Sequence, residues 1–320
     1  MEKMMTRPTG NRGGRTLTTA RSLLAAMAAL AAMGAACGPA SGSDPSKIIA
    51  VGAENEYANV IAQIGGPYVS VSAIESNPNT DPHTFEASAQ VSSEVSAAQL
   101  VVENGVGYDS WIDTILSSSP NSSRRLIDVQ TLLGLPNNTP NPHLWYDPTT
   151  MPAVATRIAV DLAALDPAHA GYFHSQATTF VNSLAPWNGA IAALKSSFGG
   201  APVATTEPVA DYLLQAAGLN NLTPWPFQAD VMNGVDPPAQ DVSLEQGFFT
   251  QHKVKVFIYN QQVTDSLTQS LLTLASQNGI PVVGVYETMP TPGYDYQTWM
   301  RAEVNAMKQA LADGTSTTRL

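Results

Sequence analysis

Strand-like and helix-like segments alternate along most of the chain, and this order constrains the fold more than any single motif. Short apolar runs that suit buried strands are followed by segments whose apolar residues recur at helical spacing. The pattern predicts an open parallel sheet with helices on both faces. In the first half the strand-like segments are 48–53, 68–74, 100–103 and 125–129, and the helix-like segments are 57–64, 88–99 and 109–116.

The segment 151–198 interrupts this alternation because it shows no strand signal. Its large apolar residues fall at spacings of three, four and seven, which places them largely on one helical face. We predict one long, rigid connecting helix at 167–198. Proline has no backbone N–H, so Pro186 is expected to kink or break this helix.

The alternation resumes after residue 199, so the predicted fold is α/β with two similar lobes. Each lobe, 47–166 and 199–320, is expected to be a parallel sheet with flanking helices, and the long rigid helix joins them. The proline-rich stretch 223–238 is interpreted as a long loop. In the second lobe the expected strands are 203–206, 254–259 and 280–286, and the expected helices are 209–217, 266–277 and 296–311.

The N-terminal residues are expected to serve export rather than the fold. Basic residues up to Arg21 precede an apolar run at 23–36 that is too short to span a bilayer comfortably. Cys37, the only cysteine, follows small residues in an arrangement that resembles a bacterial lipobox. We predict a signal peptide at 1–36, a lipidated Cys37 that anchors the chain to the outer face of the cell membrane, and a tether at 37–46. The alternative is an ordinary secretion signal with an incidental cysteine.

The acidic charge balance of the chain excludes one class of partner. The formal net charge is -11, with only 15 Lys and Arg residues. Phosphate binding needs clustered Lys and Arg, so no nucleic-acid partner is expected.

Two of the five histidines stand in nearly identical surroundings. His83 follows Asp-Pro and His143 follows Asn-Pro, and an aromatic residue, Phe85 or Trp145, comes two positions later. The proline holds each histidine in a loop, and the aromatic residue is expected to shield it from water. Imidazole is the commonest transition-metal ligand, so the pair predicts half of a four-ligand site. The other three are interpreted as surface residues: His169, His174 and His252.

Two carboxylates follow predicted strands of the second lobe. Glu207 comes after the strand 203–206, and Glu287 comes after 280–286. Open α/β sheets bind ligands at the carboxyl ends of their strands, so both are candidate ligands. Two simpler roles stay open: Glu207 stands before Pro208 at a helix start, and Glu287 could be a solvated loop residue.

The sequence lacks the common catalytic signatures. It contains no HExxH, no GxSxG, no GxxxxGK[ST] and no CxxC. We therefore do not expect an enzyme.

Several motifs, in order, resemble the metal-binding receptors (solute-binding lipoproteins) of zinc and manganese ABC importers. The resemblance covers most of the chain after the N-terminal segment, and the two histidine motifs with an NG-containing segment between them are its most specific part. The motifs are DPHTFEAS from Asp81, LVVENGVGYDSWID from Leu100, NPHLWYDP from Asn141, LDPAHAGYF from Leu165, TEPVADYLLQAAGL from Thr206 and IPVVGVYETMP from Ile280.

The resemblance implies two lobes joined by a rigid helix, with one metal ion between them for delivery to an ABC importer permease. It assigns the first two ligands to His83 and His143 and the third to Glu207. The fourth ligand of the family is usually an aspartate. Glu287 is the nearest candidate here, and Asp295 is the fallback.

The expected cargo is one Zn²⁺ per chain, with Mn²⁺ as the alternative. The histidine-rich loop of many zinc-specific relatives is absent from 133–141, and a glutamate as third ligand leans toward manganese in that family. Two imidazoles and two carboxylates suit zinc and also accept manganese, and the usual affinity order favours zinc. We expect a monomer.

Two other functions stay open on the sequence alone. One is a secreted metallohydrolase that uses the same histidines with Glu86 or Asp147 as general base. The other is a two-lobe receptor for an organic or chelated-metal ligand, since fold alone says little about function.

Overall fold

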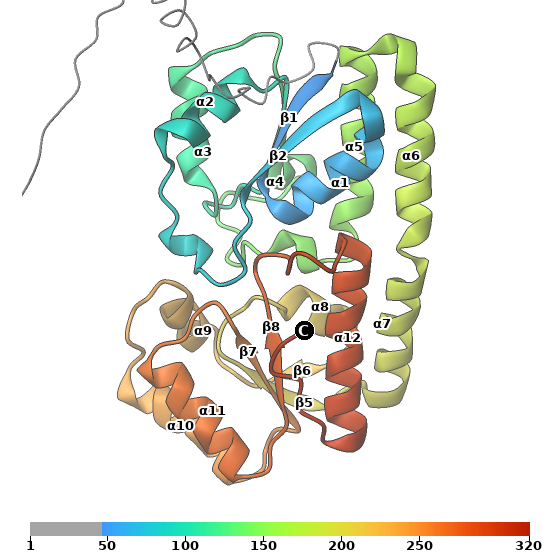
Figure 1. Ribbon diagram of the computed structural model, residues 1–320. Coiled ribbons are helices and arrows are strands. Elements are labelled where there is room, and N and C mark those ends of the chain that lie inside the picture. The colour runs from blue at the N-terminus through green and yellow to red at the C-terminus, as the bar shows by residue number, and fades with distance from the viewer. Residues whose placement is uncertain (1–46) are drawn as a thin grey trace, which may run out of the picture. The chain divides into compact units, whose positions relative to one another are not determined.

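The computed structural model describes residues 47–320, and this part of the chain forms two α/β lobes (Figure 1). The predicted signal peptide, Cys37 and the tether lie outside the described residues. Within residues 47–320, no helix is both long and apolar enough to cross a membrane.

The first lobe is built on a parallel sheet of order β2-β1-β3-β4. Almost every residue of β1 and β3 is buried, as expected for strands covered on both faces. Its elements are β1 Ile48–Glu54, α1 Asn55–Gly65, β2 Val69–Glu75, α2 Ala89–Ala97, β3 Leu100–Glu103, α3 Ser110–Ser118, β4 Arg125–Asp128, α4 Val129–Leu132 and α5 Thr150–Leu165.

The second lobe repeats this strand order with a parallel sheet β6-β5-β7-β8. The repetition confirms the predicted fold class of two parallel sheets with flanking helices. Its elements are β5 Pro202–Thr205, α8 Asp211–Ala216, β6 Asn220–Asn221, α9 Trp225–Met232, α10 Ala239–Thr250, β7 Val256–Asn260, α11 Ser266–Gln277, β8 Val282–Val285 and α12 Tyr296–Asp313.

The prediction of a long loop at 223–238 is wrong, because α9 occupies half of it. Pro224 is the N-cap of α9 and Pro226 lies in its first turn. Proline is well tolerated at these positions, since the first N–H groups of a helix have no intrahelical partner. The prolines therefore begin a helix here rather than prevent one.

The predicted connecting helix is present as two helices end to end, α6 Ala170–Ser183 and α7 Ala185–Phe198. The break falls at Leu184, and Pro186 stands in the first turn of α7. Leu184 keeps right-handed helical angles (φ -77°, ψ -10°), so the chain continues in much the same direction. Figure 1 shows α6 beside the first lobe and α7 beside the second.

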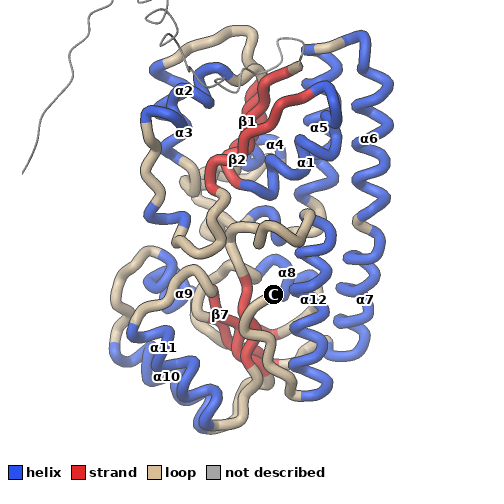
Figure 2. Tube along the Cα trace, in the orientation of Figure 1, coloured by secondary structure: helices blue, strands red, loops and turns tan. Residues whose placement is uncertain are grey.

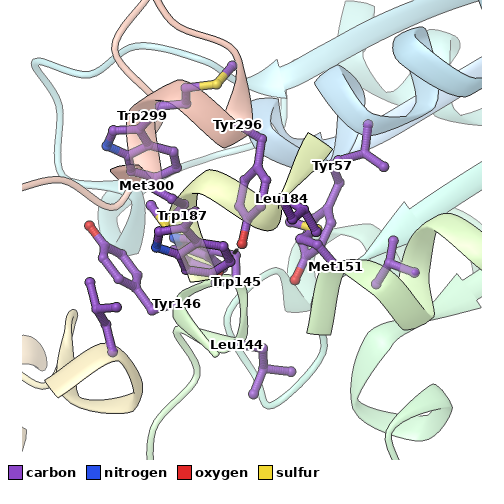
Figure 3. Close-up of a cluster of buried hydrophobic side chains, with 14 of the residues drawn as sticks. Tyr57, Leu144, Trp145, Tyr146, Met151, Leu184, Trp187, Tyr296, Trp299 and Met300 are labelled. Atoms are coloured by element: carbon purple, nitrogen blue, oxygen red, sulfur yellow. Dashed lines mark hydrogen bonds between the residues drawn. The ribbon is translucent and has the colours of Figure 1, made fainter. Parts of the chain in front are cut away.

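A shared aromatic core fixes the two lobes to each other (Figure 3). Trp187 of α7 packs edge-on against Tyr296 of α12, with ring centroids 5.8 Å apart. The Tyr296 hydroxyl donates a hydrogen bond of 2.6 Å to the carbonyl of Trp145. Tyr146 in turn donates to the carbonyl of Tyr286 at 2.7 Å. Because these rings come from the connecting helices and from both lobes, wide hinge motion would expose a large apolar surface.

The shared strand order also locates the ligand site. In each sheet the chain crosses over in opposite directions from one central strand, β1 or β5. Ligands of such sheets bind where these crossovers diverge, at the carboxyl ends of the strands. Figure 2 shows loops between the two sheets. His143, Glu207 and Glu287 lie in loop segments, and His83 lies in a single 3-10 turn, Pro82–Thr84, between β2 and α2.

Candidate metal centre

The two histidine motifs fold in the same way because each begins with an Asp or Asn side chain. Asp81 Oδ1 accepts a hydrogen bond of 2.9 Å from the backbone N of His83. Asn141 Oδ1 accepts one of 3.0 Å from the backbone N of His143. These side-chain-to-backbone turns, with the intervening proline, fix the loop around each histidine. The shared Asp or Asn two residues before histidine was the sequence signal for this role.

Asn141 also sets the orientation of the His143 ring. Its Oδ1 lies 2.7 Å from His143 Nδ1, which leaves Nε2 facing Glu287 as the ring nitrogen available to a ligand. Asn141 is itself anchored in the second lobe, because its Nδ2 donates to the carbonyl of Pro208 at 2.8 Å. Such a hydrogen bond to the second nitrogen is the usual partner of a metal-binding imidazole.

Glu287 joins the two histidines at the centre of the site. Its Oε2 lies 3.2 Å from His83 Nε2 and 3.1 Å from His143 Nε2, and its side chain is fully buried. The three residues offer ligand atoms that all lie within 4.8 Å of one another, and no other such group occurs within residues 47–320. The structure therefore brings together three of the four predicted ligands.

Glu207 adjoins this group through a shared amide. The Nδ2 of Asn260 donates to Glu287 Oε1 at 2.5 Å and to Glu207 Oε2 at 3.2 Å. The other oxygen of Glu207, Oε1, is buried and has no hydrogen-bond partner among the described residues. Burial and the neighbouring Glu287 charge raise the pKa of Glu207 well above its usual value. A buried carboxylate oxygen without a hydrogen-bond partner can still accept one further ligand.

The contacts with Glu287 shift the pKa values of the ionisable groups in the site. Desolvation lowers the pKa of both histidines, and His143 stays below its usual value. For His83, the hydrogen bond to Glu287 and the nearby carboxylates outweigh burial and raise its pKa to about 9. Burial alone would raise the pKa of Glu287, but its hydrogen bonds with both histidines hold it below the usual range. Metal ligands must be deprotonated, so a bound cation would displace the proton on His83.

The segment between the histidine motifs supplies a residue that sequence reasoning missed. Tyr108 donates a hydrogen bond of 3.0 Å from its hydroxyl to Glu287 Oε2. Asn104 ties the same segment to the second histidine loop by donating to the carbonyl of Pro142 at 2.8 Å. Gly105 has φ +75°, and a Cβ there would lie 2.7 Å from Asp128 Oδ1, so glycine is required. The sequence feature that could have pointed to Tyr108 is the NGVGYD run that contains it.

The aromatic shielding expected from the sequence is present for one histidine. The ring of Trp145 packs edge-on against His143 with centroids 5.5 Å apart. Phe85 instead packs against Trp111 at 5.0 Å. The ring next to His83 is instead that of Tyr108, and the two ring centroids are 5.1 Å apart. The centre is therefore enclosed by aromatic rings on the first-lobe side.

Three other carboxylates considered from the sequence lie outside the group. Asp295 caps α12, where its Oδ1 accepts from the backbone N of Thr298 at 2.8 Å. Asp147 Oδ1 accepts from the backbone N of Thr149 at 2.8 Å. Glu86 is exposed on the loop after His83. The general bases imagined for a hydrolase are thus absent from the described cluster.

Replacing Asp295 by alanine is expected to cost about 1 kcal/mol of folding stability, because α12 loses its N-cap. Urea unfolding measures this loss, and Asp295→Asn serves as the control because asparagine also caps helices well. Metal affinity should stay within about twofold of the unchanged chain. A large loss of affinity in both variants would instead make Asp295 a ligand.

The sequence pattern of one known family spans most of the chain. Residues 51–310 match ZnuA, described as the periplasmic component A of the zinc-uptake complex. The chain belongs to this family. The ZnuA-family match confirms the resemblance recognised in the sequence: the chain is an extracytoplasmic receptor for a divalent transition metal of the kind that serves ABC importers.

Solved structures support the two-lobe ZnuA-family fold. The periplasmic zinc-binding protein TroA from Treponema pallidum is 16% identical, with a TM-score of 0.70 over 84% of this chain and 99% of that one. A ZnuA structure is 20% identical, with a TM-score of 0.69 over 83% of this chain and 100% of its own. FpvC from Pseudomonas aeruginosa, solved with Ni²⁺, is 19% identical with a TM-score of 0.68 over 85% and 99% of the two chains. It has also been solved with Mn²⁺.

Proposed function

We propose that the chain binds one divalent transition-metal ion through His83, His143, Glu207 and Glu287. The observation that carries this proposal is the convergence of ligand atoms of His83, His143 and Glu287 within 4.8 Å of one another, with His143 and Glu287 buried. Two imidazoles held by prolines and side-chain turns, facing one carboxylate, form most of a tetrahedral site.

Glu207 is the proposed fourth ligand because it shares the Asn260 amide with Glu287 and its buried Oε1 has no partner among the described residues. An unpartnered carboxylate in the interior is costly unless it is paired or binds a metal. A divalent cation between Glu207 and Glu287 would remove the repulsion that raises the pKa of Glu207. Asn260 would then hold both carboxylates in position through its hydrogen bonds to Glu207 Oε2 and Glu287 Oε1, as outer-shell groups of metal sites do.

We propose zinc as the preferred ion and manganese as the alternative. The ligand set contains two nitrogen and two oxygen donors, which suits four-coordinate zinc. Affinity for such a site generally rises from manganese to zinc along the first-row series. Relatives of this fold have been solved with Ni²⁺ and Mn²⁺, so the preference must come from the geometry of this site.

The proposed role is capture and delivery rather than catalysis. A catalytic zinc keeps one coordination position open for water, whereas four protein ligands would fill this site. Glu86 and Asp147, the two candidate bases, lie outside the cluster. The ion is therefore treated as cargo that an ABC importer permease receives unchanged.

We further propose that Cys37 is lipidated and that the receptor acts as a monomer at the outer face of the cell membrane. The supports are the lipobox-like residues before Cys37 and the short stretch between it and β1. A monomer is consistent with both lobes sharing their core within one chain.

Thermal unfolding of the soluble chain that starts after Cys37 tests the proposal. After chelator treatment, Zn²⁺ added in excess should raise stability, by about 2.7 kcal/mol when the free ion is about 100 times Kd. Mn²⁺ should give a smaller rise at the same free concentration. No rise with any divalent ion would overturn the metal site and favour the organic-ligand receptor.

A further inference from the structure

His83 is the most accessible of the converging ligands, and a loop carries it. Its side chain is 23% exposed, whereas those of His143 and Glu287 are fully buried. The loop 76–88 joins β2 to α2, and the hydrogen bonds within it are local, such as Thr80 N to the Asn77 carbonyl at 3.3 Å. His83 can therefore move without disrupting a strand or a long helix.

The rest of the interface between the lobes is tied more firmly. Asn55 of α1 exchanges two hydrogen bonds with the backbone of Met289, at 2.8 and 2.9 Å. Gln63 and Gln297 exchange side-chain hydrogen bonds across the same boundary at 2.7 and 2.9 Å. With the aromatic core around Tyr296, these contacts oppose separation of whole lobes. Local opening at the His83 loop is the less costly way for an ion to leave.

One side chain of the second lobe holds this loop. The Nε2 of Gln262, a nearly buried residue, donates to the carbonyl of Thr80 at 2.7 Å. Its Oε1 accepts from the backbone N of Glu287 at 2.7 Å and of Thr288 at 2.9 Å. Within residues 47–320, the Gln262–Thr80 bond is the only hydrogen bond from loop 76–88 to the second lobe besides the His83–Glu287 contact. Gln262 therefore links the backbone of Glu287, a proposed ligand, to the loop that carries His83.

We propose that Gln262 is a positioning residue that latches loop 76–88 onto the second lobe and so slows release of the bound metal. The proposal rests on the metal site proposed above. A cavity of about 310 Å³ lies beside the latch, lined by Thr80, Asp81, Pro82 and Thr288 among others. It gives water and the loop space to move once the latch opens. The amide suits this task because it carries no charge that would repel the ion.

Release kinetics of Gln262→Ala test the latch. Zinc-loaded protein is mixed with excess chelator to give the dissociation rate, and stripped protein is mixed with Zn²⁺ to give the association rate. Loss of an outer-shell partner typically changes metal affinity by 10–100-fold, and we expect about a tenfold faster dissociation. The association rate should change by less than about twofold, because most affinity changes appear in dissociation.

Gln261→Ala is the matched control. It removes the same side chain one position earlier, where Gln261 lies against Gly284 and makes no side-chain hydrogen bond among the described residues. Its release rate should equal that of the unchanged chain. Equal rates for Gln262→Ala and the unchanged chain would overturn the proposal, provided that the unchanged chain binds zinc. Absence of zinc binding in the unchanged chain would overturn the proposed function itself.

Amide hydrogen exchange of the zinc-loaded proteins separates latching from a general structural effect. If Gln262 holds loop 76–88, Gln262→Ala should speed exchange within that loop and leave the strands of both sheets unchanged. Equal exchange of the loop in Gln262→Ala and in the unchanged chain would contradict the latch. If Gln262→Ala does not fold, Gln262→Glu replaces it. It keeps the oxygen that accepts from Glu287 and Thr288 but loses the N–H that reaches Thr80, and it should also release zinc faster.

Discussion

Zinc affinity is expected to fall by about a thousandfold or more when His143 is replaced by alanine. Loss of an outer-shell partner alone usually costs 10–100-fold, and this change removes a proposed ligand. It also removes a hydrogen-bond partner of Glu287 in a fully buried place. An unpartnered buried charge adds to the loss of the coordinate bond. Competition with a chelator of known zinc affinity measures the change.

His174→Ala is the control for this experiment. His174 is exposed on α6 and far in sequence from both histidine motifs, so its removal should leave zinc affinity within about twofold. The folding stability of both metal-free variants must also be measured, because loss of fold would mimic loss of a ligand. A folded His143→Ala protein that binds zinc as tightly as the unchanged chain would contradict the proposed ligand set.

Folding stability is expected to fall by about 3–5 kcal/mol when Trp187 is replaced by alanine. Trp187 is 1% exposed and packs against Tyr296 in the core that joins the connecting helices to both lobes. Removing the indole leaves a cavity that neighbouring large rings cannot easily fill. Urea or guanidinium unfolding of the metal-free protein measures the loss.

Trp225→Ala is the matched control, since this indole is 38% exposed at the start of α9. Surface substitutions of this kind usually change stability by less than about 0.5 kcal/mol. Equal losses in the two tryptophan variants would contradict the view that the core around Trp187 holds the lobes together.

The fold was largely predictable because its central strands are buried and apolar. The short apolar runs at 48–53, 100–103 and 280–286 alternate with amphipathic helical segments, so a buried strand is the structure that best suits them. The prediction failed at 223–238, where Pro224 and Pro226 begin α9 in a stretch predicted as loop. The short polar strand β6 and the helix α10 were not predicted. The expected break of the connecting helix at Pro186 is confirmed.

The candidate site was predictable for residues that carry a local signal. His83 and His143 share a motif, and Glu287 directly follows a recognisable strand. Tyr108, Asn260 and Gln262 were missed because their importance arises from contacts far along the chain, such as Tyr108 with Glu287. A polar side chain gives no sign in the sequence of which distant carboxylate or backbone group it will reach.

A crystal structure of the zinc-loaded protein, with anomalous diffraction at the zinc edge, tests the ligand set most directly. We expect one peak, with His83 Nε2 and His143 Nε2 at about 2.0–2.1 Å and single oxygens of Glu207 and Glu287 at about 2.0–2.2 Å. An anomalous peak away from these four residues, or a zinc ion between them that neither histidine binds, would contradict the account.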